Sequence, residues 1–529
     1  MARQNSRYAA LDIHPANDAA DGDRQEEIPA LQAEVHRLED LMARLQEEKL
    51  VLLHRINNAQ EKTGRLPFEV LSNIFLFARP PIDFTAHEPT FYDDDDPNHP
   101  PVTGYYDPAE DFHHTLAAVS HRWRQVVLST PQLWTSISLC VRNTFTEYRT
   151  SLLNLHFKNA RNLGVSILLD FSNPTLVWEN ISSRRSDFLM HLEPLVETIF
   201  EDNSDQVQSL FLIQPPAEWS SFMCGSLPRC NSVTIYWPSS EPYCNYFFNF
   251  HDLPCLRHVK LVGSDFPLTL PATASSLQLS HTDLHKSIRL LVESPNLVEF
   301  ESSHHFTGSL VSQSNGKITK PIILHRLENL TWDAQHIDDM HDFLRHVRFN
   351  NLRTLQWYEG TRNERRTSEE GESLRLAFFS SLPSTLSSLI FDEIDLDLPH
   401  ILDLLSCVPQ LTELHFINYR SWVVDDIIKA IGRSLADQGT PSSALTVLPN
   451  LCVLSISGAK YWGMLEPFVF IELLETLHAA GPRPKQFHLI TYSEVIWCSD
   501  ALDKVRALLS SGLDAKITFD VDGSKSEIS

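Results

Sequence analysis

A few histidines and carboxylates of this chain have spacings that could support chemistry. His281 and His285 lie four residues apart with Asp283 between them, so a helix would place both imidazoles on one face. A zinc site needs three or four ligands, and no further ligand can be identified for this pair. The four consecutive aspartates at 93–96 lack the alternating ligands and the bidentate glutamate of a calcium loop. We therefore expect no metal ion at either place.

Motifs of catalysis are missing from the sequence. It contains no G-x-S-x-G nucleophile elbow, no P-loop, no H-E-x-x-H motif and no dinucleotide-binding fingerprint. Only 17 of the 529 residues are glycine, which disfavours a glycine-rich phosphate loop. The sequence predicts no catalytic residue and no cofactor, and so it indicates a binding protein and not an enzyme.

Composition and charge narrow the possible partners and compartments. The chain has 43 Lys and Arg against 68 Asp and Glu, a formal net charge of −25 that repels nucleic acid and anionic membranes. Its eight cysteines are scattered without a C-x-x-C pair, as expected of free thiols in a reducing compartment. No secretory signal and no run of 18 apolar residues is present. We expect a protein of the cytoplasm, the nucleus or both.

The elements begin with a polar tail and a heptad helix. Residues 1–27 are rich in Asp, Ala, Asn and Gln, and we expect them to be disordered. Over 28–60 apolar residues recur in alternating steps of three and four, interrupted by Lys49, which predicts a coiled-coil-like helix. The series is Ile28, Leu31, Val35, Leu38, Met42, Leu45, Leu52 and Ile56. Either this helix forms a homodimer through residues 28–56, or it folds back on its own chain.

Two short amphipathic blocks follow, separated by an acidic, proline-rich insert at about 80–112. The first block, 66–76, reads L-P-F-E-V-L-S-N-I-F-L, with Pro67 suited to a first helical turn and Glu69 where the helix dipole favours a carboxylate. The second, 116–127, reads L-A-A-V-S-H-R-W-R-Q-V-V, and T-P-Q-L-W comes shortly after it. Two short helices cannot bury all of these apolar side chains, so some must pack on the rest of the chain or on a partner.

In their order and internal spacing these three blocks resemble an F-box of the kind common in mushroom-forming fungi, where a heptad-like helix also precedes the box. The resemblance covers residues 66–134, and the long insert departs from a compact F-box. It implies that residues 61–135 bind a Skp-type adaptor, which would join the chain to a cullin–RING ubiquitin ligase. The adaptor-binding residues that it implies are Leu66, Pro67, Glu69, Val70, Leu71, Ile74, Phe75, Leu116, Val119, Trp123 and Val126.

Residues 136–520 follow a different rhythm, L-x-x-L-x-L, in which L is any apolar residue. Steps between its central residues are mostly near the 20–29 residues of leucine-rich repeats, and these residues are Leu210, Val233, Val259, Leu277, Phe300, Leu330, Leu355, Leu389, Leu414 and Leu454. The asparagine position of that repeat is unfilled, so the turns must be satisfied in another way. We expect an irregular leucine-rich-repeat solenoid with a parallel sheet and with Trp332 and Trp357 in its core. A generic α/β domain is the alternative.

The sequence thus predicts an α/β chain: a coiled-coil-like helix, a helical F-box module, an irregular repeat array and a disordered tail at 521–529. Its expected function is non-catalytic. It would be the substrate-recognition subunit of a Skp–cullin–F-box ubiquitin ligase, holding an unknown protein target on the array. The alternative is an F-box or coiled-coil interaction scaffold without a role in degradation.

Overall fold

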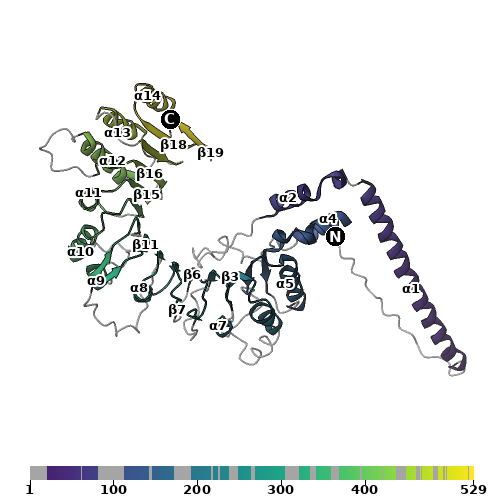
Figure 1. The fold of residues 1–529 in the computed structure, drawn as a ribbon. Coiled ribbons are helices and arrows are strands. Elements are labelled where there is room, and N and C mark those ends of the chain that lie inside the picture. The colour runs from purple at the N-terminus through teal and green to yellow at the C-terminus, as the bar shows by residue number, and fades with distance from the viewer. Residues whose placement is uncertain are drawn as a thin grey trace. The chain divides into compact units, whose positions relative to one another are not determined.

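A computed structural model of the 529-residue chain describes most of it as two compact units (Figure 1). Unit 1 consists of the described residues within 1–80 and 111–133, and unit 2 of those within Trp134–Ser529. Residues 1–20, and residues 81–111 of the predicted insert, lie outside the described part. The described segments are 21–60, 62–80, 112–141, 146–171, 192–215, 219–223, 227–236, 248–263, 268–303, 321–333, 341–358, 369–393, 396–419, 421–436, 448–459, 465, 467–479, 486–492, 495, 497–521 and 524–528.

Unit 1 contains one long helix, α1 (Asp21–Gln60), of 40 residues, drawn in purple in Figure 1. It begins at Asp21, whereas the predicted boundary between tail and helix was at residue 28. The prediction was late because the first two turns are polar and carry no periodic apolar residue. Every described side chain of α1 is exposed.

The remaining helices of unit 1 are short. They are η1 (Lys62–Arg65), α2 (Phe68–Ala78), α3 (Phe112–Val119) and α4 (His121–Ser129), and η2 (Pro131–Trp134) comes directly after them. Pro67, which has no N–H to leave unsatisfied, stands at the N-cap of α2. Ser120 caps α4 because its hydroxyl accepts a 3.1 Å hydrogen bond from the N–H of Trp123. Proline and serine at these places explain where the two helices begin.

Unit 2 is built on a large, mostly parallel sheet, which makes it a mixed α/β unit. In the described residues 15 strands stand side by side in chain order, and only β19 runs antiparallel to its neighbour. The strands are β1 (Ser136–Cys140), β2 (Val165–Asp170), β3 (Val207–Ile213), β4 (Ser232–Tyr236), β6 (His258–Val262), β8 (Ser276–Ser280), β9 (Glu299–Ser303), β11 (Asn329–Asp333), β13 (Thr354–Tyr358), β14 (Ser388–Asp392), β15 (Glu413–Tyr419), β16 (Val453–Ala459), β17 (Phe487–Thr491), β18 (Ala515–Val521) and β19 (Ser524–Ile528).

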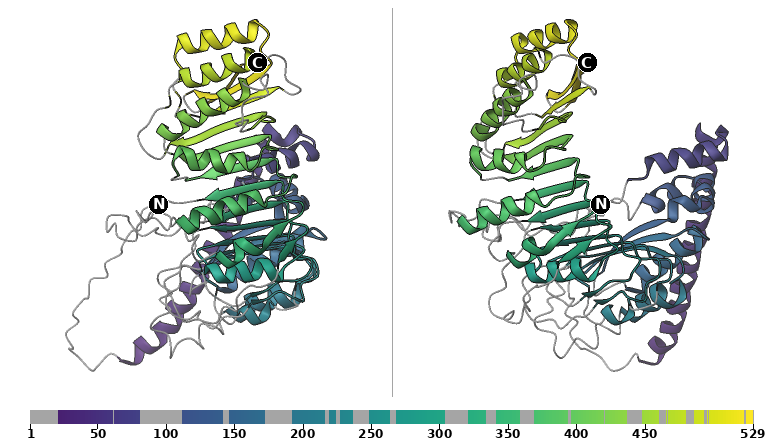
Figure 2. Two further views of the ribbon diagram at one scale, coloured as in Figure 1. Left: turned by 90° about the vertical axis from the view of Figure 1, so that its left-hand side faces the viewer. Right: turned by 60° about the vertical axis from the view of Figure 1, so that its left-hand side comes forward.

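Helices connect many of these strands, and in the second half of unit 2 they lie along one face of the sheet (Figure 2). Two pairs of short parallel strands stand apart from it: β5 (Phe248–Asn249) with β7 (Leu268–Thr269), and β10 (Ile322–Leu324) with β12 (Val347–Phe349). The helices are α5 (Thr146–Ala160), η4 (Glu197–Asp202), α7 (Trp219–Phe222), α8 (Leu284–Glu293), α9 (His341–His346), α10 (Glu369–Ser380), α11 (Leu398–Ser406), α12 (Ser421–Ala436), α13 (Pro467–Ala479) and α14 (Ser499–Ser510).

A column of buried apolar residues crosses the sheet. Each is paired in register with the next, and the ten central residues predicted from the sequence, from Leu210 to Leu454, all belong to it. Two further members precede them on β1 and β2, and two follow on β17 and β18. The full column is Ile137, Ile167, Leu210, Val233, Val259, Leu277, Phe300, Leu330, Leu355, Leu389, Leu414, Leu454, Leu489 and Ile517.

A second buried column runs two residues further along each strand and packs against the helices. Trp332 and Trp357 are paired in this column and both are buried, which confirms their predicted place in the core. The ring of Trp332 stacks 5.1 Å from Phe343 of α9, and the ring of Trp357 lies 5.3 Å from Phe378 of α10. These aromatic contacts fix the helices on that face of the sheet.

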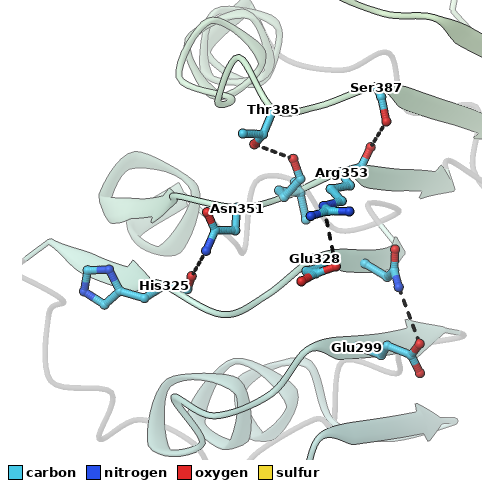
Figure 3. Close-up of polar contacts among 9 residues, drawn as sticks. Glu299, His325, Glu328, Asn351, Arg353, Thr385 and Ser387 are labelled. Carbon is cyan, nitrogen blue, oxygen red and sulfur yellow. Dashed lines mark hydrogen bonds and ion pairs between the residues drawn. The ribbon is translucent and has the colours of Figure 1, made fainter.

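The chain enters its strands through a hydrogen-bond ladder of backbone and side chains. The carbonyl of Glu328 accepts hydrogen bonds from the N–H groups of both Arg353 and Thr354. In the next repeat, the carbonyl of Arg353 accepts hydrogen bonds from the N–H groups of Ser387 and Ser388. Beside these bonds, a side chain of one repeat reaches a carbonyl of the repeat before it, as Asn351 does to His325 at 2.7 Å (Figure 3). The equivalent donors are Asn296, Gln410 and Asn450. This ladder connects neighbouring repeats at the edge where the strands begin.

At the opposite edge, several strands carry a residue with left-handed backbone near or just after their last residue. It lies four residues after the central residue, and in four of the five cases its N–H donates to a backbone carbonyl near the end of the next strand. These residues are Gln214, Gly263, His281, Glu393 and Asn418, and the bonds of the first four measure 2.8–3.1 Å. Backbone amides therefore satisfy the turns for which the sequence offered no asparagine.

The C-terminal residues differ from their prediction. Residues 521–529 were expected to be a disordered tail, but β19 pairs with β18 from Ile517 to Val521. The Nζ of Lys516 lies 2.9 Å from the carboxylate of Glu527. The strand is polar and carries no apolar alternation, so the sequence pattern did not reveal it. Its backbone covers the otherwise open edge of the sheet.

None of the helices in the described segments is long and apolar enough to cross a bilayer.

Candidate protein-docking surface

The apolar side chains of α2 divide between two faces of the helix. Leu71 and Phe75 are buried inside unit 1. Val70, Ile74 and Phe77 follow one another at helical spacing on another face and are 42%, 45% and 93% exposed. We call Pro67, Val70, Ile74 and Phe77 the α2 stripe; all four are exposed. An 11-residue helix that is apolar on two faces has one face left for another molecule.

The buried face of α2 packs on α4 through an aromatic contact. The rings of Phe75 and Trp123 lie 4.7 Å apart at 56°. The indole N–H of Trp123 donates a 2.8 Å hydrogen bond to the hydroxyl of Thr63 in η1. One residue earlier, the guanidinium of Arg122 donates to the carbonyl of Leu66. The first turn of α2 is thereby attached to α4 by both apolar and polar contacts.

The second half of α2 is attached to the segment after α4. The hydroxyl of Thr130 donates its hydrogen to the carbonyl of Val126 at 2.7 Å. Because that hydrogen is used, the hydroxyl of Ser72 is the donor in the 2.9 Å bond between Ser72 and Thr130. Arg79 donates to the carbonyl of Gln132 at 3.2 Å. Partial burial lowers the pKa of Arg79 from its ordinary value. These bonds attach both ends of α2 to the rest of unit 1, so the α2 stripe has a fixed position within that unit.

A buried histidine of α3 attaches that helix to the segment after α4. The Nε2–H of His113 donates to the carbonyl of Leu133 at 2.6 Å. The pKa of His113 is lowered to about 4, mainly by burial and to a smaller extent by the nearby charges of Arg79 and His114. The imidazole is therefore neutral at neutral pH. It serves as a structural donor and not as an acid or base.

The structure separates the eleven residues predicted to bind an adaptor into three groups. Pro67, Glu69, Val70, Ile74 and Val119 are exposed, and Leu66 and Trp123 are partly buried. The other four are buried within unit 1, where they pack beneath the exposed residues; they are Leu71, Phe75, Leu116 and Val126. Only the first seven are accessible to another molecule in the described structure, and that the set binds an adaptor stays a prediction.

Two exposed aromatic residues of α2 were not in the predicted set. Phe77 is the most exposed large apolar residue among those described, and Phe68 is 41% exposed. The signal for Phe77 was present in the sequence, because it lies three residues after Ile74 and seven after Val70. Phe68 lies between Pro67 and Glu69, and nothing in the pattern distinguishes it from a buried residue.

Asp283 and His281 have structural roles, whereas the four aspartates at 93–96 lie outside the described residues. The carboxylate of Asp283 caps α8 by accepting the N–H of Lys286 at 3.1 Å. His281 is the left-handed residue after β8. Among the described residues, no group of three or more His, Cys, Asp or Glu side chains is arranged to hold a metal ion.

Comparison with known proteins adds no assignment: no protein-family model matches this chain, and no curated protein matches its sequence.

Proposed function

We propose that this chain is the substrate-recognition subunit of a Skp–cullin–F-box ubiquitin ligase, in which unit 1 is an F-box that docks a Skp-type adaptor. The observation that carries the proposal is the α2 stripe. Pro67, Val70 and Ile74 belong to the first block of the F-box resemblance, and Phe77 follows that block directly. All four are exposed, and the other face of α2 is packed.

The α2 stripe has the properties of a docking surface for an apolar partner. Phe77 is 93% exposed, which is a poor environment for an aromatic ring unless another molecule covers it. Interfaces are typically anchored by a few central apolar or aromatic side chains surrounded by polar residues. Glu69 and Asn73 are exposed beside the stripe and supply such a polar border.

In this proposal unit 2 is an irregular leucine-rich-repeat solenoid that holds the target protein. The in-register column from Leu210 to Leu454, with its spacing near that of leucine-rich repeats, supports the assignment. Its contribution would be proximity, because holding a target beside the ubiquitin-transferring enzyme needs no catalytic group on this chain.

The face of the sheet that lacks helices has a polar surface suited to a target. The carboxylate of Asp392 accepts hydrogen bonds from Gln356 at 3.1 Å and from Asn418 at 3.0 Å, and Tyr358 donates to Glu393 at 2.6 Å. Glu393 is buried and supports this face, whereas Asp392 is partly exposed; together with the net charge of −25, Asp392 favours a basic segment of the target.

Co-expression with a Skp-type adaptor tests the proposal. The full chain should co-purify with the adaptor, and Val70→Glu with Ile74→Glu should abolish the complex. A matched control is Val292→Glu with Ile323→Glu, which places the same charges at residues of unit 2 that are 38% and 46% exposed. Equal recovery of adaptor with the two double variants would refute the assignment of the α2 stripe.

Ubiquitin transfer distinguishes a receptor from a scaffold. The complex of this chain, adaptor, cullin and RING protein should ubiquitylate the chain itself or a bound protein when supplied with the transferring enzymes. A complex that assembles but transfers nothing would favour the scaffold without a role in degradation.

A further inference from the structure

The apolar seam of α1 is uncovered over its whole described length. Its residues from Leu31 to Ile56 are between 46% and 61% exposed, and the flanking Leu41 and Leu53 are each 45% exposed. The seam members described are Leu31, Val35, Leu38, Met42, Leu45, Leu52 and Ile56. A helix with such a stripe is stable in water only when a second element covers the stripe, because helical propensity alone is too weak.

We propose that α1 pairs with α1 of a second copy of this chain as an antiparallel two-stranded coiled coil. In this pairing Met42 faces Leu45 of the second copy, and Val35 faces Leu52. The seam is thereby covered by an identical seam, and the only charged seam position, Lys49, faces an apolar residue. The inference concerns α1 alone and goes beyond the proposed docking of an adaptor.

The charges of α1 argue against a parallel pair. In a parallel dimer identical seam residues meet, so Lys49 would face Lys49 inside the interface. The positions flanking the seam would bring Glu34 of each helix beside Glu39 of the other. Both contacts repel, and the glutamate contact would occur twice because of the two-fold symmetry.

In the antiparallel pair each of these two repulsive contacts is replaced by a favourable one. Lys49 then faces Leu38 of the second copy, along whose surface its aliphatic stem can lie. Glu34 comes beside Arg55 of the second copy, again twice. In the single chain the Glu34 carboxylate accepts hydrogen bonds of 2.7 and 2.8 Å from Arg37, and it has unused acceptor positions for a second guanidinium.

The register of the antiparallel pair also follows from charge. A shift of one heptad in one direction would place Glu34 beside Glu48 of the second copy. A shift in the other direction would place Glu48 beside Glu48. Only the register that aligns Met42 with Leu45 joins unlike charges at these flanking positions without joining two glutamates there.

Light scattering on the purified full chain, without adaptor, tests the dimer. The expected mass is twice the chain's 60.3 kDa. Leu38→Glu with Leu45→Glu should return the mass to that of one chain, and since both residues are exposed in the single chain, this variant should remain folded. A mass of one chain for the wild type, or a mass above two chains, would overturn the proposal.

Charge reversal tests the orientation. Glu34→Lys or Arg55→Glu alone should weaken the dimer about tenfold, because two attractive contacts become repulsive. The double variant should restore it. Glu47→Lys and Arg44→Glu, on the side of α1 away from the seam, are matched controls that should leave the dimer unchanged. Tighter association of Glu34→Lys would overturn the antiparallel arrangement, because that change relieves the contact with Glu39 in a parallel pair.

Discussion

The indole ring of Trp123 lies 4.7 Å from the ring of Phe75, on the side of α2 opposite to solvent, and its N–H donates to Thr63. One side chain of α4 thus contacts both α2 and the η1 segment before it. This contact holds α2 in place from its buried face, and no residue of the α2 stripe belongs to it. The surface and its support can therefore be altered separately by mutation.

Removal of the support should cost stability. Trp123→Ala loses the ring contact with Phe75 and the bond to Thr63, and we expect the free energy of unfolding of unit 1 to fall by about 3 kcal/mol. Val70→Glu with Ile74→Glu should leave it nearly unchanged, because those side chains are exposed. Limited proteolysis in urea, scored by mass spectrometry for cleavage within 112–133, measures both. An unchanged midpoint for Trp123→Ala would contradict the proposed support.

Acid should weaken unit 1 through His113. Its pKa is about 4 in the folded chain and 6.5 as the ordinary value, so between these pH values the unfolded chain binds the extra proton. The free energy of unfolding of unit 1 is therefore highest above pH 6.5, and it should fall by about 2 kcal/mol between pH 7 and pH 5.

His113→Gln keeps a donor for the Leu133 carbonyl and cannot be protonated. The same proteolysis assay at pH 7 and pH 5 should show a smaller loss for this variant than for the wild type. Equal losses for the two proteins would mean that His113 is not the group responsible.

The side-chain ladder of unit 2 should contribute in small, separate amounts. Asn296, Asn351 and Asn450 each donate to a carbonyl of the preceding repeat at 3.0, 2.7 and 3.4 Å. Alanine at each position should lower stability by about 0.5–1 kcal/mol. The three losses should add, because the sites share no partner. Urea denaturation followed by circular dichroism measures them, and a triple variant as stable as the wild type would exclude the ladder as a source of stability.

The sequence predicted the middle of the sheet better than its ends. From β3 to β16 the first apolar position of L-x-x-L-x-L is filled in nearly every repeat, and those strands were located correctly. In β2, β17 and β18 the same position is occupied by Gly164, Gln486 and Asp514, so the pattern was hidden. Gly164 has a steric reason: a Cβ there would lie 2.8 Å from the Cβ of Gln208.

The candidate surface was only partly predictable. The sequence located α2 and its apolar residues, but Val70 and Leu71 are adjacent and equally apolar. Which of them is buried depends on how α2 packs against α4, and that packing depends on contacts across about 50 residues of chain, such as Phe75 with Trp123. A helical pattern gives the period of a helix and not the face that a distant segment will cover.

Hydrogen exchange of the full chain with and without a purified Skp-type adaptor tests the central claim most directly. The account predicts that the adaptor slows exchange in α2, at residues 68–78, and leaves α10, at residues 369–380, unchanged. It also predicts that Val70→Glu with Ile74→Glu abolishes this protection. An adaptor that does not bind, or that binds while α2 exchanges at its free rate, would contradict the account.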